Sequence, residues 1–121
     1  MIARARLWPE ARSDIDSLPT TALRYAAVEA IVSVQENPWS GAELRARARI
    51  GDLSGLRRVT FDTADWTEKP RYRVVYRNEP DEGVVEVVAV IAVGLRERLS
   101  AYKEAAARLR AERRRRMLDS G

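Results

Sequence analysis

Residues 71–95 read RYRVVYRNEPDEGVVEVVAVIAVGL, and this segment decides the fold. Residues 71–77 are rich in β-branched and aromatic side chains, which favour a strand. Residues 84–93 are almost wholly apolar, as expected of a central strand that is covered on both faces. Between them, residues 78–83 (NEPDEG) have the Asn, Pro, Asp and Gly content of a turn. The segment therefore predicts two antiparallel strands joined by a turn.

The flanking residues extend this pair into a larger unit. Residues 56–61 (LRRVTF) have strand composition, and the polar connection 62–70 joins them to residues 71–77, so an antiparallel three-strand meander is expected. After Gly94, residues 97 to about 116 form a predicted helix. Its inner stripe consists of four residues at helical spacing: Leu99, Tyr102, Ala106 and Leu109.

The first part of the chain predicts a short strand followed by a helical hairpin. Residues 1–7 suit an edge strand, and Pro9 suits the first turn of a helix that Leu18-Pro19 ends. A second helix runs to Asn37-Pro38, where proline again disfavours helical backbone. Residues 39–52 fit either a strand with a basic face or an irregular loop, and the loop is favoured because nothing large fills their apolar side. The predicted fold class is α+β.

The composition fits one domain and excludes several kinds of site. At 121 residues, 45% of them hydrophobic, the chain can fill one core and is too short for two ordinary domains. It has no cysteine and no histidine, which excludes disulfides, thiolate metal sites, zinc hydrolases and catalytic triads. No metal and no cofactor is expected. Two arginines precede any apolar run, and the longest apolar stretch, residues 87–95, is too short to span a membrane. We therefore expect a cytoplasmic protein without membrane association.

Positive charge is concentrated at the C-terminus. The net charge is +4, and residues 108–121, with six arginines against Glu112 and Asp119, carry all of it. The chain therefore divides into one domain at residues 1–110 and an arginine-rich tail at residues 111–121, which is expected to fray. A GC-rich genome would also favour arginine over lysine, but a guanidinium still grips phosphate through two parallel hydrogen bonds.

Alternation along the predicted strands places several arginines on common faces. In residues 71–77 the three arginines share one face and the two tyrosines share the other. In residues 56–61, Arg57 and Arg58 lie on opposite faces, so one of them must point inward or line a cleft. The sequence leaves open which one does. A solvated basic face over a buried aromatic face would explain the same pattern in residues 71–77.

Arg96, directly after the central strand, and Tyr102, within the following helix, add to this pattern. Arginines from neighbouring strands that converge near a tyrosine would form a phosphate site, able to bind RNA or to cleave it. Arginines stabilise the charge of the phosphorane but keep their own protons. The proton steps therefore need another group, such as Tyr102 or the surroundings of the substrate. Tyr102 could equally have a purely structural role, as a half-buried aromatic residue in the inner stripe of the helix.

The C-terminal half resembles the RelE/ParE superfamily of bacterial toxins, and the RelE branch more than the ParE branch. The matching segments are RYRVVYR (71–77), VVEVVAVIAV (84–93) and VGLRERLSAYKEAAARL (93–109). The last is the most specific, because it carries five residues at RelE-like spacing: Gly94, Arg96, Glu97, Arg98 and Tyr102. The resemblance covers about residues 8–110. It implies a RelE-like fold, with an N-terminal strand and helical hairpin followed by an antiparallel three-strand meander and a C-terminal helix.

RelE-like toxins cleave messenger RNA in the ribosomal decoding site without a metal, and a cognate antitoxin wraps and silences them. The resemblance therefore implies the toxin component of a type II toxin–antitoxin system, a ribosome-dependent mRNA endonuclease (mRNA interferase) that inhibits translation. The implied partners are a cognate antitoxin, the ribosome and mRNA, and the free toxin is expected to be a monomer. The antitoxin is expected to lay an acidic amphipathic helix along the arginine-bearing face.

Carried over position by position, the resemblance makes four residues catalytic. Arg73 would grip the scissile phosphate, and Arg96 would stabilise charge and assist the leaving oxygen. Tyr102 would stack on or orient a nucleotide, and Arg57 occupies a strand position that is often basic in the family. A wider RNA-binding set is expected to comprise Arg58, Lys69, Arg71, Arg77 and Arg98.

Three features depart from the family pattern. The second basic residue that follows Arg57 by two positions is here Val59, and the connection at residues 62–70 is longer than usual and carries Trp66. The tail beyond Leu109 has no expected counterpart, and either docks on ribosomal RNA or is a solvated terminus. Two alternative functions stay open: a ParE-like DNA gyrase inhibitor, or a non-catalytic family member that only binds a partner.

Overall fold

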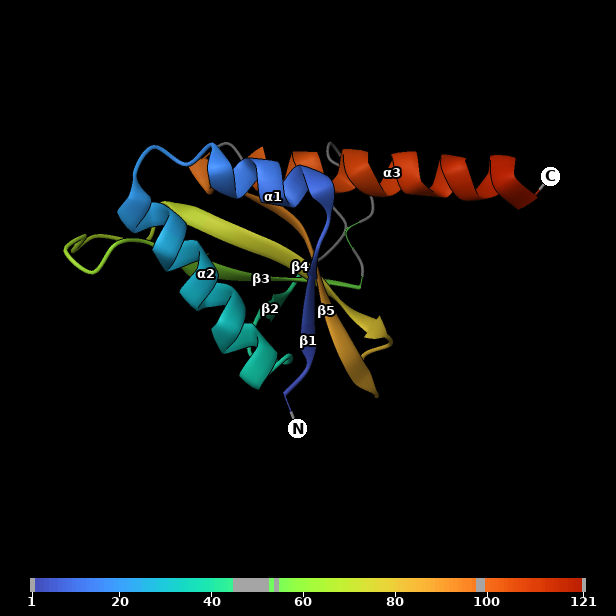
Figure 1. Ribbon diagram of the computed structural model, residues 1–121, viewed down its shortest axis with the longest axis horizontal. Coiled ribbons are helices and arrows are strands. Elements are labelled where there is room, and N and C mark those ends of the chain that lie inside the picture. The colour runs from blue at the N-terminus through green and yellow to red at the C-terminus, as the bar shows by residue number, and fades with distance from the viewer. Residues whose placement is uncertain (1, 45–52, 54, 98–99, 121) are drawn as a thin grey trace.

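The chain folds around a five-stranded sheet with helices packed on it, and the computed structural model describes residues 2–44, 53, 55–97 and 100–120 (Figure 1). The elements in chain order are β1 (Arg4–Leu7), α1 (Pro9–Asp16), α2 (Thr21–Glu36), β2 (Ala42–Glu43), β3 (Leu56–Phe61), β4 (Tyr72–Pro80), β5 (Val85–Leu95) and α3 (Ser100–Ser120). This is the predicted α+β order with the short strand β2 added. Among the helices of the described residues, none combines the length and the apolar character needed to cross a membrane.

The strands lie side by side in the order β1-β5-β4-β3-β2. The predicted antiparallel meander of β3, β4 and β5 is confirmed, and β1 joins it parallel to β5. In β5, every residue from Val88 to Ala92 has an exposure of 0%. The apolar run in the sequence therefore forms the buried centre of the sheet, as predicted.

The two faces of β4 meet different helices. Tyr72, Val74 and Tyr76 face the side of α2, whose apolar stripe joins the core, whereas Arg73 and Val75 lie under α3. The predicted alternation of arginines and tyrosines is confirmed. The arginine face is not simply solvated, however, because α3 covers its centre and leaves Val75 fully buried.

The turn predicted at residues 78–83 begins later than expected. β4 continues through Pro80, so the first half of the predicted turn is strand. The buried Asn78 explains the difference, because its side-chain amide donates to the carbonyl of Pro38 at 3.0 Å instead of closing a local turn. The carboxylate of Asp81 closes the turn instead, and accepts two backbone N–H groups at 2.8 and 2.9 Å.

Two other boundaries also differ from the prediction. The loop expected at residues 39–52 contains strand β2, which pairs with β3 through Ala42 and Glu43, while residues 45–52 lie outside the described residues. The C-terminal helix does not end near residue 116, because α3 runs through the arginine-rich tail to Ser120. Figure 1 shows this end of α3 extending past the sheet.

One polar joint connects α1, β5 and α3. β1 pairs with β5 only as far as Val90, which leaves the edge of β5 open beyond that residue. Asp14 of α1 closes this edge by accepting the backbone N–H of Val93 at 3.0 Å, and Arg108 of α3 donates to the carbonyl of Ile91 at 2.7 Å. Arg108 and Asp14 also bind each other through hydrogen bonds of 2.7 and 3.0 Å.

The joint keeps Arg108 charged although its side chain is only 14% exposed. Burial alone would lower the pKa of Arg108, but the hydrogen bonds and the charge of Asp14 outweigh burial and raise it. The guanidinium and the carboxylate therefore satisfy each other and two backbone groups of β5 at the same time.

Replacing Asp14 by Asn should lower the free energy of unfolding by about 2 kcal/mol, since hydrogen bonds to charged groups contribute roughly 1.5–3 kcal/mol. The variant keeps the shape of the side chain but removes the carboxylate nearest to Arg108 and leaves it the more distant Glu104, at 3.6 Å. Urea unfolding at neutral pH measures the difference. The matched control is Asp16→Asn on the same helix, where the side chain is exposed, and it should change the value by less than about 0.5 kcal/mol. Equal losses in both variants would contradict the role of the joint.

Candidate functional site

Arg73 is the central basic residue of a cleft at the junction of β5 and α3. In the register of the sheet it lies opposite Thr60 of β3 and Gly94 of β5. The cleft has a volume of about 470 Å³, and its lining consists of Arg71, Arg73, Leu95, Arg96 and Glu97. Three of the predicted site residues therefore share one cavity, which they reach from the start of β4, its interior and the end of β5.

Tyr102 holds Arg73 from the α3 side. The Arg73 guanidinium lies over the Tyr102 ring, 4.6 Å from its centroid, and the tyrosine is only 1% exposed. This cation–π contact fixes the arginine while its charge remains. The ring lies inside the protein, as its place in the helical stripe predicts, so its stacking on a nucleotide stays a prediction.

Asp62 and Trp66, both in the connection between β3 and β4, immobilise Arg71. The Asp62 carboxylate accepts the Nε and Nη2 hydrogens of Arg71, each at 2.8 Å, and also its backbone N–H at 2.9 Å. The Arg71 guanidinium stacks on the Trp66 ring at 3.7 Å from its centroid. The side-chain hydrogen bonds from Arg71 hold the pKa of Asp62 well below its usual range, against the opposing effect of burial. Arg71 is therefore a rigid wall of the cleft, with most of its charge neutralised.

Arg96 and Glu97 form the opposite wall. The backbone N–H of Arg96 donates to the carbonyl of Arg71 at 2.7 Å, which ties the end of β5 to the immobilised arginine. Among the described residues, no group accepts a hydrogen bond from the Arg96 side chain. Glu97 is exposed. The lining of the cleft thus combines the guanidinium groups of Arg73 and Arg96 with the carboxylate of Glu97.

The structure answers the question that the sequence left open about Arg57 and Arg58. Arg57 faces the same side as Tyr76, whereas Arg58 pairs with Val75 on the side of Arg73. Only Arg58 of the two therefore lies on the arginine face, together with Thr60, which the sequence reasoning did not select. The alternation of residues 56–61 could have indicated this once the face of Arg73 was known.

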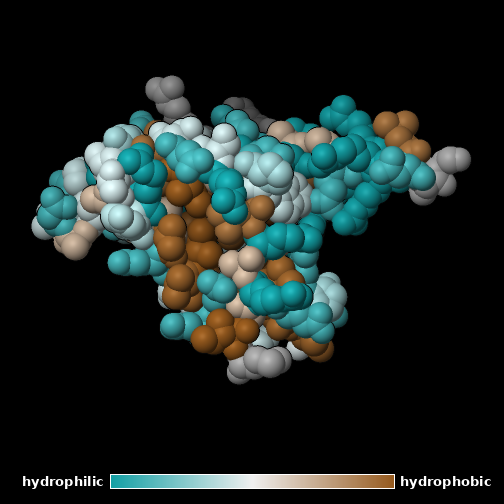
Figure 2. Space-filling view, viewed as in Figure 1, coloured by the Kyte–Doolittle hydropathy of each residue, from teal (hydrophilic) through white to brown (hydrophobic). Residues whose placement is uncertain are grey.

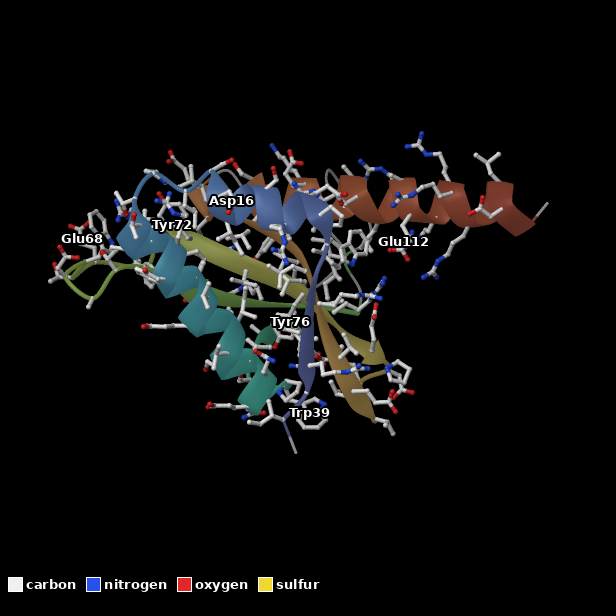
Figure 3. All side chains as sticks on the ribbon, viewed as in Figure 1. Asp16, Trp39, Glu68, Tyr72, Tyr76 and Glu112 are labelled. Carbon is white, nitrogen blue, oxygen red and sulfur yellow. The ribbon has the colours of Figure 1, made fainter. Side chains whose placement is uncertain are left out.

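Arg57 belongs to a polar network at the other end of the sheet. Its guanidinium, 12% exposed, contacts Glu82 at 3.1 Å and Glu43 at 3.2 Å, and donates to the carbonyl of Gly41 at 2.6 Å. Tyr76, central in Figure 3, donates to Pro38 at 2.8 Å in the same network, and burial raises the pKa of its hydroxyl. These contacts give Arg57 a structural role and separate it from the cleft.

The other predicted residues lie away from the cleft. Lys69 is exposed in the β3–β4 connection. Arg77 pairs with Glu79 at 2.7 Å and lines a separate cavity of about 290 Å³ beneath α3. Val59 is half-buried opposite Val74, and Arg98 lies outside the described residues. Among the described residues, no group of three or more acidic or other metal-binding side chains could hold a metal ion.

No protein-family model and no curated protein sequence matches this chain. Solved structures do match. The RelBE2 toxin–antitoxin complex from Mycobacterium tuberculosis matches with a TM-score of 0.51 at 25% identity, over 79% of this chain and 100% of that chain. A variant of the Escherichia coli RelE toxin in the free state matches with a TM-score of 0.57 at 23% identity, over 90% of this chain and 99% of that chain. The isolated E. coli RelE toxin matches with a TM-score of 0.55 at 23% identity, over 88% of this chain and 98% of that chain.

The Asp62 pair should make the stability of the protein depend on pH. Because the folded-state pKa of Asp62 is depressed, its contribution is complete above the unfolded value of about 3.9 and declines as the pH falls from there through the lower folded-state value. The free energy of unfolding of Asp62→Asn should therefore lie below that of the parent at pH 7, by a smaller difference at pH 3. Asp65→Asn, exposed in the same connection, is the control. A difference from the parent that stays constant between these pH values would contradict the role of the carboxylate.

Proposed function

We propose that this chain, which its structure assigns to the RelE-like toxin superfamily, is the toxin component of a type II toxin–antitoxin system. We further propose that it acts as a ribosome-dependent, metal-independent endoribonuclease that cleaves mRNA and so inhibits translation in the cytoplasm. The observation that supports this most directly is the convergence of Arg71, Arg73 and Arg96 on one cleft.

The cleft suits the charge of a reacting phosphodiester. In the proposed reaction the 2′-oxygen attacks the adjacent phosphorus, the O2′–P bond forms, and the P–O5′ bond breaks. The products are a 2′,3′-cyclic phosphate and a free 5′-hydroxyl. Arg73 and Arg96 bind the non-bridging oxygens, where negative charge grows in the transition state. Because Tyr102 already holds Arg73 in place, this stabilisation requires little reorganisation.

The two proton transfers need a group other than arginine. A guanidinium keeps its protons at ordinary pH, and the chain has no histidine. Glu97 is the carboxylate in the lining of the cleft. We assign it the role of general base, which takes the proton of the 2′-hydroxyl. The leaving 5′-oxygen regains a proton from protonated Glu97 or from water, while Arg96 donates a hydrogen bond to it.

Arg58 replaces Arg57 in the proposed site. It shares the face of Arg73, whereas Arg57 is committed to Glu43 and Glu82 on the other side of the sheet. Arg58 lies along the same face at some distance from the cleft, so its proposed role is to bind the RNA backbone beside the scissile phosphate. Its charge also suits an acidic helix of the cognate antitoxin, the proposed inhibitor.

A second candidate function is supported by a specific observation. The ring of Tyr102 is buried, and the position two residues after Arg57 is Val59 instead of a basic residue. A chain with these features would bind the ribosome and block it without cutting the message. Cleavage mapping separates this non-catalytic function from the proposed nuclease.

In a reconstituted bacterial translation reaction, the purified protein should create new mRNA 5′ ends within codons at the decoding site, and only when ribosomes are present. Arg73→Ala and Arg96→Ala should each lower the cleavage rate by about 10²- to 10³-fold, the cost of losing one preorganised donor of this kind. Arg12→Ala, an exposed arginine of α1, is the control and should cleave like the parent. Arrested translation with intact message would indicate the non-catalytic function. Unimpaired translation would contradict both and leave gyrase inhibition to be tested.

Glu97→Gln should lower the cleavage rate by about 10²- to 10⁴-fold, the range for a positioned general base, and should leave binding to ribosomes unchanged. Gln has almost the same shape but does not accept a proton at neutral pH. Glu29→Gln, an exposed substitution on α2, is the matched control. If the Glu97 variant cleaves at the rate of the parent, the proton must be taken by a group outside this chain.

A further inference from the structure

The C-terminal end of α3 projects from the core of the protein, to which it contributes, among the side chains that the structure describes, no buried one beyond Leu109. Leu109 is the last residue of α3 that is buried in the core, at 6% exposure. Beyond it, the described side chains are exposed except that of Glu112, which is half-buried. Figure 1 shows this red segment projecting past the sheet and past the other helices. Packing in the core therefore does not explain the amino-acid composition of α3 beyond Leu109.

Four successive arginines, residues 113–116, surround this projecting helix, and we call them the arginine spike. Successive residues of an α-helix are rotated by about 100°, so four in a row cover its whole circumference. Figure 2 shows hydrophilic side chains along this end of the molecule and hydrophobic ones only near its tip. The apolar residues there, Met117 and Leu118, are adjacent and form no stripe.

Most of this charge is not neutralised within the protein. Glu112, labelled in Figure 3, pairs with Arg116 at 2.7 Å and approaches Arg77 at 3.6 Å. Within the described residues, Arg113, Arg114 and Arg115 form no ion pair. Adjacent like charges disfavour a helix, and residues 113–116 bury no side chain that would compensate for the repulsion. A partner with dense negative charge would offset this repulsion.

The distribution of charge indicates the class of partner. A helix that lies on a membrane surface, or in the groove of another protein, needs an apolar face, and the arginine spike has none. Phosphates that approach from several sides would match it, as in a groove of a folded RNA that a bulge or junction widens. We propose that the arginine spike binds the phosphate backbone of folded ribosomal RNA. This inference rests on the proposed function, which brings the protein to the ribosome.

The test measures binding of the full-length chain to purified 16S ribosomal RNA at salt concentrations of about 50–200 mM. Arg113→Gln/Arg114→Gln should weaken binding and reduce the slope of log Kobs against log salt by about 2, close to 1 for each lost phosphate contact. Gln preserves the helix, because its helical propensity is close to that of Arg. The matched control, Arg4→Gln/Arg12→Gln, removes the same charge from exposed positions on β1 and α1 and should change the slope much less.

Equal losses in the two double variants would overturn the proposal, because net charge alone would then explain binding. An unchanged slope in the spike variant would overturn it as well, as would binding to phosphatidylglycerol vesicles in preference to RNA. The proposed nuclease is tested separately: at saturating protein, the spike variant should cleave mRNA at the rate of the parent. If the parent does not cleave but the spike variant loses RNA binding, the nuclease is contradicted and the RNA-binding role of the spike is supported.

Discussion

The joint between Asp14, Arg108 and the open edge of β5 holds α1 and α3 against the central strand, and the candidate site lies where this strand meets α3. β5 is the buried centre of the sheet, and beyond Val90 it has no neighbouring strand on one side. The carboxylate of Asp14 and the guanidinium of Arg108 take the place of that strand by binding the backbone of Val93 and Ile91. Since Arg108 belongs to α3, the same contacts fix this helix across the sheet and so place Tyr102 over Arg73.

The arginines of this chain separate into groups by what surrounds each one. Arg57, Arg71 and Arg108 are bound to carboxylates, Arg57 and Arg108 also to backbone carbonyls, and all three hold segments of the fold together. Arg73 and Arg96 line the cleft instead, Arg73 against the ring of Tyr102 and Arg96 at the end of β5, where a bound phosphate would reach them. A charged residue contributes to binding only when its charge is not already neutralised at short range. The partners of each arginine, more than their number, therefore define the site.

The sequence predicted the frame of the fold because its signals are local. The alternation of residues 71–77 and the apolar run of residues 84–93 specify the meander, and both are confirmed. The extension of β4 through Asn78 was missed because it depends on Pro38, which lies 40 residues away in the chain. Strand β2 was missed because it is held by its pairing with β3 and has only two residues.

For the candidate site, too, the sequence predicted what depends on local patterns and missed what depends on long-range contacts. Arg73, Arg96 and Tyr102 follow from strand alternation and from spacing, and the structure brings them together. The sequence places Arg57 and Arg58 on opposite faces of the strand, as observed, but only the register of β3 against β4 shows that Arg58 shares the face of Arg73. The pairing of Asp62 with Arg71 joins residues nine positions apart through a connection whose path no periodic pattern encodes.

A cleft built mainly from arginines has a consequence for how the proposed reaction would proceed. Arg73 and Arg96 can stabilise negative charge on a phosphate, but neither can remove a proton, so much of the barrier must be lowered by alignment of the 2′-oxygen with the bond that breaks. The cleft is open between the wall of Arg71 and the wall of Arg96 and Glu97, and it would not by itself fold a flexible message into that geometry. A ribosome that holds the codon in a bent conformation would supply the missing alignment. The scarcity of proton-transfer groups and the proposed dependence on the ribosome would thus have a common explanation, because a site that cannot orient its substrate alone would be inactive on free RNA.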